Sequence, residues 1–167
     1  MSLACEVLRA SPSTHRRTLS LLVHFLVEAE ADSSGFEVHN CVEALATDLG
    51  SALVPVALAA TAGEARGWWK RFKGDVGSMF DFMALARASF SRPFAQLGAT
   101  SLPGLEAGIA DPDPFIRAEA AAFLASLGPV AQPALSIMKK ALVRERSAWA
   151  RYEMQQAVDS IGALPRP

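Results

Sequence analysis

Four steps along this chain carry the same punctuation: a leucine or isoleucine, then a glycine, then a proline five residues after the glycine. Glycine tolerates the left-handed backbone conformation just past a helix end, and proline suits the first turn of a helix. Each step therefore predicts that one helix ends and another begins after a short link, as in a helical repeat. The four steps are Leu49-Gly50 to Pro55, Leu97-Gly98 to Pro103, Leu127-Gly128 to Pro133 and Ile161-Gly162 to Pro167.

The helices predicted before Gly128 and Gly162 align residue by residue at an offset of 34. Five positions at helical spacing are apolar in both helices, and Arg117 maps onto Arg151. The same five steps before Gly50 are also apolar, which is the pattern of an amphipathic helix. The positions are Ile116, Ala120, Phe123, Leu124 and Leu127; then Ala150, Met154, Ala157, Val158 and Ile161; then Val38, Val42, Leu45, Ala46 and Leu49.

Residues 110–128 resemble the turn and second helix of a HEAT repeat. They contain an Asp-Pro-Asp-Pro turn at 111–114, Arg117 three residues after it, and an alanine-rich run into Leu127-Gly128. The resemblance is clearest over residues 101–162 and weaker upstream, where His39 stands in the place of Arg117. It implies an all-α fold, namely a short right-handed α-solenoid of stacked antiparallel helix pairs of the HEAT or armadillo type. It also implies that the arginines at this place, Arg117 and Arg151, join one repeat to the next.

The Asp-Pro turn also has a mechanical role that requires no ligand. Asp111 and Asp113 can cap the helix that starts near Phe115, and their negative charge complements the helix dipole there. Arg117 lies four residues after Asp113 and can pair back to it. These residues are therefore predicted to be structural contacts of the repeat.

One domain over residues 1–167 is expected, because the chain has ample apolar content for one core but is short for two. Its approximate units are 13–50, 51–98, 99–128 and 129–162, and the second is irregular because 48 residues separate Gly50 from Gly98. Ala62-Gly63 is predicted to break a helix, and Pro93 to break or kink another. The predicted helices are 13–31, 36–49, 51–61, 64–72, 75–91, 102–110, 115–127, 130–142 and 148–161.

Charge and cysteine content bound the class of protein. The formal net charge is -1, so no whole-chain field favours nucleic acid or an anionic membrane. Cys5 and Cys41 form no disulfide framework, and the most apolar run, residues 52–62, is far shorter than the roughly 20 residues of a transmembrane helix. A soluble cytoplasmic protein without membrane contact is expected.

Catalytic patterns are sparse. The three histidines are His15, His24 and His39, and no metal-ligand spacing, phosphate-binding glycine loop or serine elbow accompanies them. A non-enzymatic protein without cofactor or metal is predicted.

A protein-binding module is the favoured function: an adaptor or scaffold, or a small inhibitor such as a bacterial immunity protein, with one or more protein partners. The segment 66–73 supplies Trp68, Trp69 and Arg71, residue types that dominate binding hot spots. The alternative for this segment is that Trp68 and Phe72 face the core while its cations are solvated. The other candidate contacts are residues expected to point outward from second helices: Asn40, Glu43, Glu119, Tyr152, Glu153, Gln156 and Asp159.

Two further functions stay open, a HEAT-like nucleic-acid-binding or DNA-repair protein and a HEAT-like enzyme of the lyase type. Residues 63–100 are the one basic segment, with six Lys and Arg against three Asp and Glu. Glu119, Glu153 and Asp159 disfavour nucleic acid, because a phosphate backbone requires cations along the binding face. The sequence leaves the partner's identity and the oligomeric state open.

Overall fold

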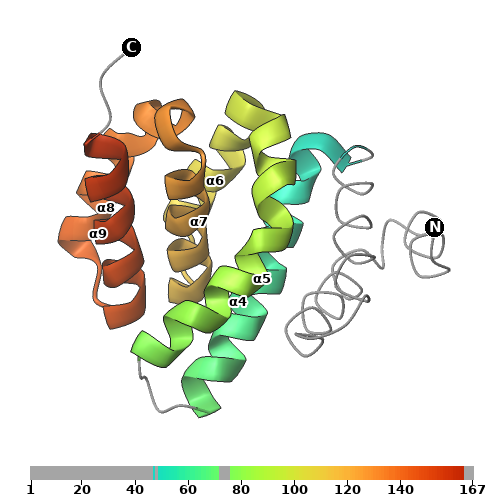
Figure 1. Cartoon of the computed structure of the whole chain (residues 1–167). Helices are drawn as coiled ribbons and strands as arrows, with labels where there is room; N and C mark the ends of the chain where they lie inside the picture. The colour runs from blue at the N-terminus through green and yellow to red at the C-terminus, as the bar shows by residue number, and fades with distance from the viewer. Residues whose placement is uncertain (1–46, 48, 72–75, 164–167) are drawn as a thin grey trace, which may run out of the picture. The chain divides into compact units, whose positions relative to one another are not determined.

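The computed structural model of this chain describes residues 47, 49–71 and 76–163, and all their regular elements are helices (Figure 1). The all-α prediction is confirmed for these residues, which contain no strand. The chain divides into two compact units, Met1–Pro93 and Phe94–Pro167, each described here by itself. The single-domain organisation stays a prediction, and the helices predicted at 13–31 and 36–49 fall outside the described residues apart from positions 47 and 49.

Three of the four glycine steps are helix junctions of one kind. Gly50, Gly98 and Gly128 have φ values of 53°, 51° and 56°, in the left-handed region that favours glycine. Each begins a short 3-10 segment, η2 (Gly50–Ala52), η3 (Gly98–Ser101) or η4 (Gly128–Ala134), and an α-helix follows directly. The prediction is confirmed at these three places.

The fourth step differs, because Gly162 is the last residue of helix α9 (Ala148–Gly162) and does not have a left-handed φ. The helix continues through this glycine and is capped by Ala163, whose N–H donates to the carbonyl of Asp159 at 3.0 Å. Helical hydrogen bonding therefore continues where the sequence pattern predicted a turn.

In the N-terminal unit, α4 is one helix, Leu53–Arg71, so the predicted break at Ala62-Gly63 is wrong. One glycine inside a helix costs only about 1 kcal/mol relative to alanine. A continuous set of buried side chains outweighs that cost on both sides of Gly63: Leu53, Val54, Ala57, Leu58, Ala60, Thr61, Ala62 and Ala65. The hydroxyl of Thr61 donates to the carbonyl of Ala57 at 3.0 Å, as is common for threonine inside a helix.

Helix α5 (Val76–Leu97) also runs past its expected end, because Pro93 lies inside it. Pro93 supplies no N–H to the helix, yet the last turn is held by burial of Phe94, whose ring centroid lies 4.5 Å from that of Phe123. The helix ends at Leu97, immediately before the left-handed Gly98. The glycine, and not the proline, is therefore the stop.

The C-terminal unit contains two helix pairs, α6 (Leu102–Ile109) with α7 (Pro114–Ser126), and α8 (Leu135–Arg144) with α9. The predicted pairs are confirmed, except that η4 replaces the predicted α-helical start at 130–134. Pro129 and Pro133 lack the N–H donors that an α-helix would use there. Helices α7 and α9 pack extensively side by side (Figure 1), with Phe123, Leu124, Trp149, Met154 and Ile161 buried in the core of the unit.

Candidate functional site

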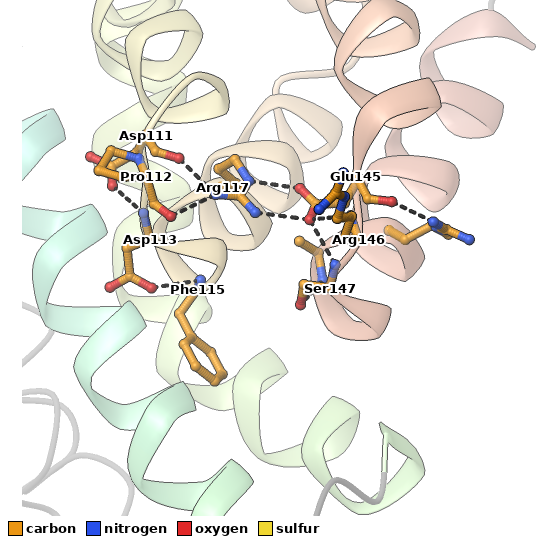
Figure 2. A network of polar contacts seen from close by, with 10 residues as sticks. Asp111, Pro112, Asp113, Phe115, Arg117, Glu145, Arg146 and Ser147 are labelled. Atoms are coloured by element: carbon orange, nitrogen blue, oxygen red, sulfur yellow. Dashed lines mark hydrogen bonds and ion pairs between the residues drawn. The ribbon is translucent and has the colours of Figure 1, made fainter.

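The turn between α6 and α7 is built on two aspartates (Figure 2). The N–H of Phe115 donates to Asp113 Oδ1 at 2.9 Å, so Asp113 caps the first turn of α7. The N–H of Asp113 itself donates to Asp111 Oδ1 at 2.8 Å, which holds the turn ahead of the cap. Proline at the first helical position fits this cap because its missing N–H is not needed there.

Arg117 joins this turn to the next helix pair. Its Nη1 donates to the carbonyls of Asp111 and Pro112 at 2.8 and 2.9 Å. Its Nε and Nη2 donate to the two carboxylate oxygens of Glu145 at 2.6 and 2.8 Å, a bidentate ion pair across 28 residues of sequence (Figure 2). The sequence suggested pairing with Asp113, but the hydrogen bonds go to the turn carbonyls and Glu145, while Asp113 acts on Arg117 through its charge.

The side chain of Glu145 is only 2% exposed, whereas that of Arg117 is 20% exposed. Besides the guanidinium, the same carboxylate accepts from the N–H groups of Arg146 at 2.9 Å and Ser147 at 2.8 Å. The hydrogen bonds from Arg117 and these two N–H groups lower the pKa of Glu145, although burial opposes them. The hydrogen bond to Glu145 raises the pKa of Arg117 in turn. Both groups are therefore charged at neutral pH.

The turn between α8 and α9 repeats the first turn at the offset of 34. Glu145 takes the place of Asp111 and accepts from the N–H of Ser147, the residue that replaces Asp113. Ser147 caps α9 by accepting from the N–H of Ala150 at 3.4 Å. Nη2 of Arg151 donates to the carbonyl of Glu145, as Nη1 of Arg117 donates to that of Asp111. The two turns thus share one hydrogen-bonding plan with different residues.

The helix faces beside these two arginines are different. Residues four apart share a helix face, so Arg117 stands with Ala121 and Ala125 on α7. Ala121 is fully buried and Ala125 half-buried. On α9 the equivalent face carries Arg151, Gln155 and Asp159, all exposed, and Gln155 Nε2 donates to Asp159 Oδ1 at 2.9 Å. We call Arg151, Gln155 and Asp159 the open face of α9.

A hollow of about 380 Å³ lies between the two turns of this unit. Arg117 and Glu145 are in its lining, but each is already held by the other and by backbone groups. General acid–base catalysis requires a pKa near the working pH, whereas these two pKa values are displaced away from neutrality. The hollow is lined by Ile109, Ala110, Asp111, Arg117, Ala141, Arg144, Glu145 and Arg146.

The candidate contacts predicted on the second helices divide into two groups. Gln156 and Asp159 are exposed, and Tyr152 is half-buried with its ring stacked against Trp149 at 6.1 Å between centroids. Glu119 and Glu153 were expected to point outward, and this is wrong, because they are 0% and 3% exposed. Helix α7 packs against both α6 and α9, so more of its surface is covered than if it contacted one helix only.

The tryptophan segment lies at the end of α4. Trp68 and Trp69 are half-buried and each makes interactions within the structure, while Arg71 is exposed. Each indole is therefore partly packed and partly exposed to solvent. This lies between the two interpretations of the segment, an exposed binding site and a tryptophan that faces the core. Phe72 and Lys73 lie outside the described residues, as do Asn40 and Glu43 and all three histidines.

Sequence reasoning missed Glu145 as the partner of Arg117. The signal was present, since adding 34 to Asp111 and Asp113 gives Glu145 and Ser147. The signal is easy to overlook because the second turn, Arg144-Glu145-Arg146-Ser147, contains neither aspartate nor proline. Carboxylate chemistry and capping chemistry are both retained there by other residue types.

Comparisons with protein-family models, curated proteins and solved structures gave no match. In the part of the chain that the structure describes, no cluster of three or more His, Cys, Asp or Glu side chains is arranged to hold a metal ion. Within those same residues, no helix has the length and apolarity needed to cross a bilayer. The cytoplasmic location and the HEAT-repeat resemblance stay predictions.

Proposed function

We propose that this chain is a short right-handed α-solenoid of HEAT-like helix pairs, and that it is a non-enzymatic module that binds another protein. The observation that carries the proposal is the turn built twice, 34 residues apart, with Arg117 of the first turn gripping Glu145 of the second. Stacked repeats contact their neighbours in this serial way, and such stacks present extended surfaces for partners.

The chemistry of the described residues favours binding over catalysis. The Arg117 and Glu145 side chains are held by each other and by backbone groups, and both are charged at neutral pH, as expected of a structural ion pair. Several candidate contacts are of the residue types enriched at interfaces: the half-buried Tyr152, Trp68 and Trp69 and the exposed Arg71. The candidates Gln156 and Asp159 are exposed as well. An adaptor or scaffold and a small inhibitor of the immunity type would both use such contacts.

The test begins with co-purification of the full chain from its source cell and mass spectrometry of the bound proteins. The affinity of a recovered partner is then measured for Trp69→Ala and Tyr152→Ala, each with a phenylalanine variant at the same position as the matched control. We expect the alanine variants to bind at least about tenfold more weakly, since aromatic hot spots are worth about 2 kcal/mol or more. The phenylalanine variants should retain most of the affinity.

Circular dichroism of each variant must show unchanged helical content, because the side chains of Trp69 and Tyr152 are partly buried. Wild-type affinity in both alanine variants would reject this placement of the interface. Recovery of no protein partner, together with turnover of a small substrate, would reject the function itself in favour of a HEAT-like enzyme.

A further inference from the structure

Arg151 occupies the place of Arg117 in the second turn, but its side chain makes one hydrogen bond where that of Arg117 makes four. Arg117 holds its own turn carbonyls with Nη1 and a carboxylate with Nε and Nη2. The guanidinium of Arg151 donates to the equivalent carbonyl of Glu145 with Nη2, and this is the one hydrogen bond of that side chain among the described residues. Arg151 is also exposed, whereas Arg117 is half-buried.

The open face of α9 does not suit a further helix pair packed as α9 packs on α7. On α7 the small side chains of Ala121, which is fully buried, and Ala125, which is half-buried, accompany Arg117. Gln155 and Asp159 replace them beside Arg151, and they are longer, polar and hydrogen-bonded to each other. A contact at this face is therefore polar and made by side chains.

Arg151 belongs to a stretch of the chain, residues 128–163, whose exposed charges are mostly positive. Residues 128–163 carry five exposed cations and one exposed carboxylate, Asp159, because Glu145 and Glu153 are buried. The sequence of these residues shows a smaller imbalance, with five cations against three carboxylates. The exposed cations are Lys139, Lys140, Arg144, Arg146 and Arg151.

We propose that Arg151 receives the carboxylate of an aspartate or glutamate in an acidic segment of a partner protein, in the way that Arg117 receives Glu145. This rests on the proposed function and names the chemistry of the partner. The Arg117–Glu145 contact shows which ligand an arginine placed on this turn accepts, a planar carboxylate bound by two parallel hydrogen bonds. The four other exposed cations attract an acidic segment and raise its rate of association.

A protein carboxylate fits this surface better than a nucleic acid does. A phosphate backbone follows a continuous basic path, and binding strength grows with each phosphate neutralised. Here Asp159 stands on the same face as Arg151, eight residues further along α9, and would repel a polyanion that continued along the helix. One carboxylate at Arg151 avoids that repulsion.

The experiment uses the full chain and random 12-residue peptides displayed on phage. Selected peptides are synthesised, and their affinities are measured by fluorescence anisotropy for the wild type, Arg151→Gln, Arg151→Lys and Arg92→Gln. Arg92 is exposed in α5, outside residues 128–163, so Arg92→Gln removes an equal charge as the matched control.

We expect the selected peptides to be rich in aspartate and glutamate and to bind Arg151→Gln at least about tenfold more weakly, since a hydrogen bond to a charged group is worth about 1.5–3 kcal/mol. The affinity of Arg151→Lys should lie between those of the wild type and Arg151→Gln, because lysine keeps the charge but lacks the planar guanidinium. Arg92→Gln should bind as the wild type does, and replacing the acidic residues of a peptide by amides should remove the dependence on Arg151.

Several outcomes would overturn the inference. Equal losses in Arg151→Gln and Arg92→Gln would show a general charge effect, and peptides displaced more strongly by a 20-base-pair DNA duplex than by glutamate-rich peptide would show a nucleic-acid surface. Self-association that Arg151→Gln abolishes would assign the face to a second copy. A natural partner whose binding survives Arg151→Gln, but is weakened by Trp69→Ala or Tyr152→Ala, would end this inference and leave the proposed function standing.

Discussion

The two turns of the C-terminal unit follow the same plan with opposite outcomes. At the first turn, Arg117 is 20% exposed and joined to Glu145, and its helix face is lined with small, covered side chains. At the second, Arg151 is exposed and its face carries Gln155 and Asp159. The hydrogen bonds within each turn are similar, so local structure does not explain the difference. It arises from what lies beside each turn.

This comparison separates two roles of one residue type. An arginine that pairs with a buried carboxylate stabilises the fold, because removing it leaves an uncompensated charge inside the protein. An exposed arginine with one hydrogen bond contributes little to stability and is available for recognition. Sequence alignment alone makes Arg117 and Arg151 equivalent, and the structure shows that their equivalence stops at the turn.

Removing each arginine is the strongest way to break the comparison. Arg117→Ala should lower the free energy of unfolding by on the order of 3 kcal/mol, because Glu145 then stays buried without its partner. Arg151→Ala should lower it by less than about 1 kcal/mol, since an exposed arginine gives up little when it is removed. Urea unfolding followed by circular dichroism measures both. Equal losses would show that the two turns are energetically alike.

Exchanging the residues beside the arginines tests the faces themselves. Ala121→Gln should destabilise the protein by about 2 kcal/mol, because it forces a larger polar side chain into a fully buried position. Gln155→Ala should change stability by no more than about 0.5 kcal/mol, as exposed substitutions commonly do. Thermal unfolding of the two variants compares them, and tolerance of Ala121→Gln would mean that α7 is less closely covered than its burial indicates.

The glycines that follow α7 and end α9 provide a third contrast. Gly128→Ala should cost about 1–2 kcal/mol, because its φ of 56° is unfavourable for a residue with a side chain. Gly162→Ala should be neutral or slightly stabilising, since no heavy atom lies within 4 Å of an added Cβ and its φ is not left-handed. Chemical denaturation distinguishes them, and a loss in Gly162→Ala as large as that in Gly128→Ala would contradict the assignment of Gly162 to the helix.

The helix caps Asp113 and Ser147 should differ less in their contribution to stability. Asp113→Ala and Ser147→Ala should each lower stability by about 1 kcal/mol, with the larger loss at Asp113 because its charge also complements the helix dipole. The bond accepted by Ser147 is the longer one, at 3.4 Å against 2.9 Å. Asp113→Asn is the matched control, since it keeps the cap and removes the charge. A larger loss at Ser147 would reverse the ranking.

Acid provides the mildest test. The folded-state pKa of Glu145 is lowered, so its contribution to stability is fully present above its unfolded-state pKa and is lost as pH falls through the folded-state value. The loss should begin near pH 4.5, the ordinary pKa of a glutamate, and should grow at lower pH. Stability curves of the wild type and Glu145→Gln should therefore converge below pH 4.5. Parallel curves would show that the carboxylate does not titrate as described.

Features that depend on local physics were predictable from the sequence. Gly98 and Gly128 mark junctions because few other residues adopt a left-handed φ, and Asp113 caps α7 because its side chain reaches an N–H two residues away. The pattern of helix pairs follows from the same signals. Where a signal was local but weak, as at Gly63, the buried neighbours along α4 decided the outcome.

Features that depend on distant residues were not predictable in this way. Burial of Glu119 depends on the packing of α7 against two other helices, and the partner of Arg117 lies 28 residues away. Helix α5 continues past Pro93 because the next side chain, Phe94, is buried. The sequence of residues 128–163 has five cations against three carboxylates, and burial of Glu145 and Glu153 leaves one exposed carboxylate, which only the folded chain reveals.

The ion pair between Arg117 and Glu145 also indicates how helix pairs could be added to a protein of this kind. A tandem duplication of residues 99–128 would place the arginine of the first copy beside the turn that contains Asp111 in the second copy. The alanines of the first copy, which correspond to Ala121 and Ala125, are small and would accommodate the added helix. Lengthening from the interior in this manner would preserve the polar flank at α9 unchanged. The number of helix pairs would then change while the exposed residues Arg151, Gln155 and Asp159 stayed the same.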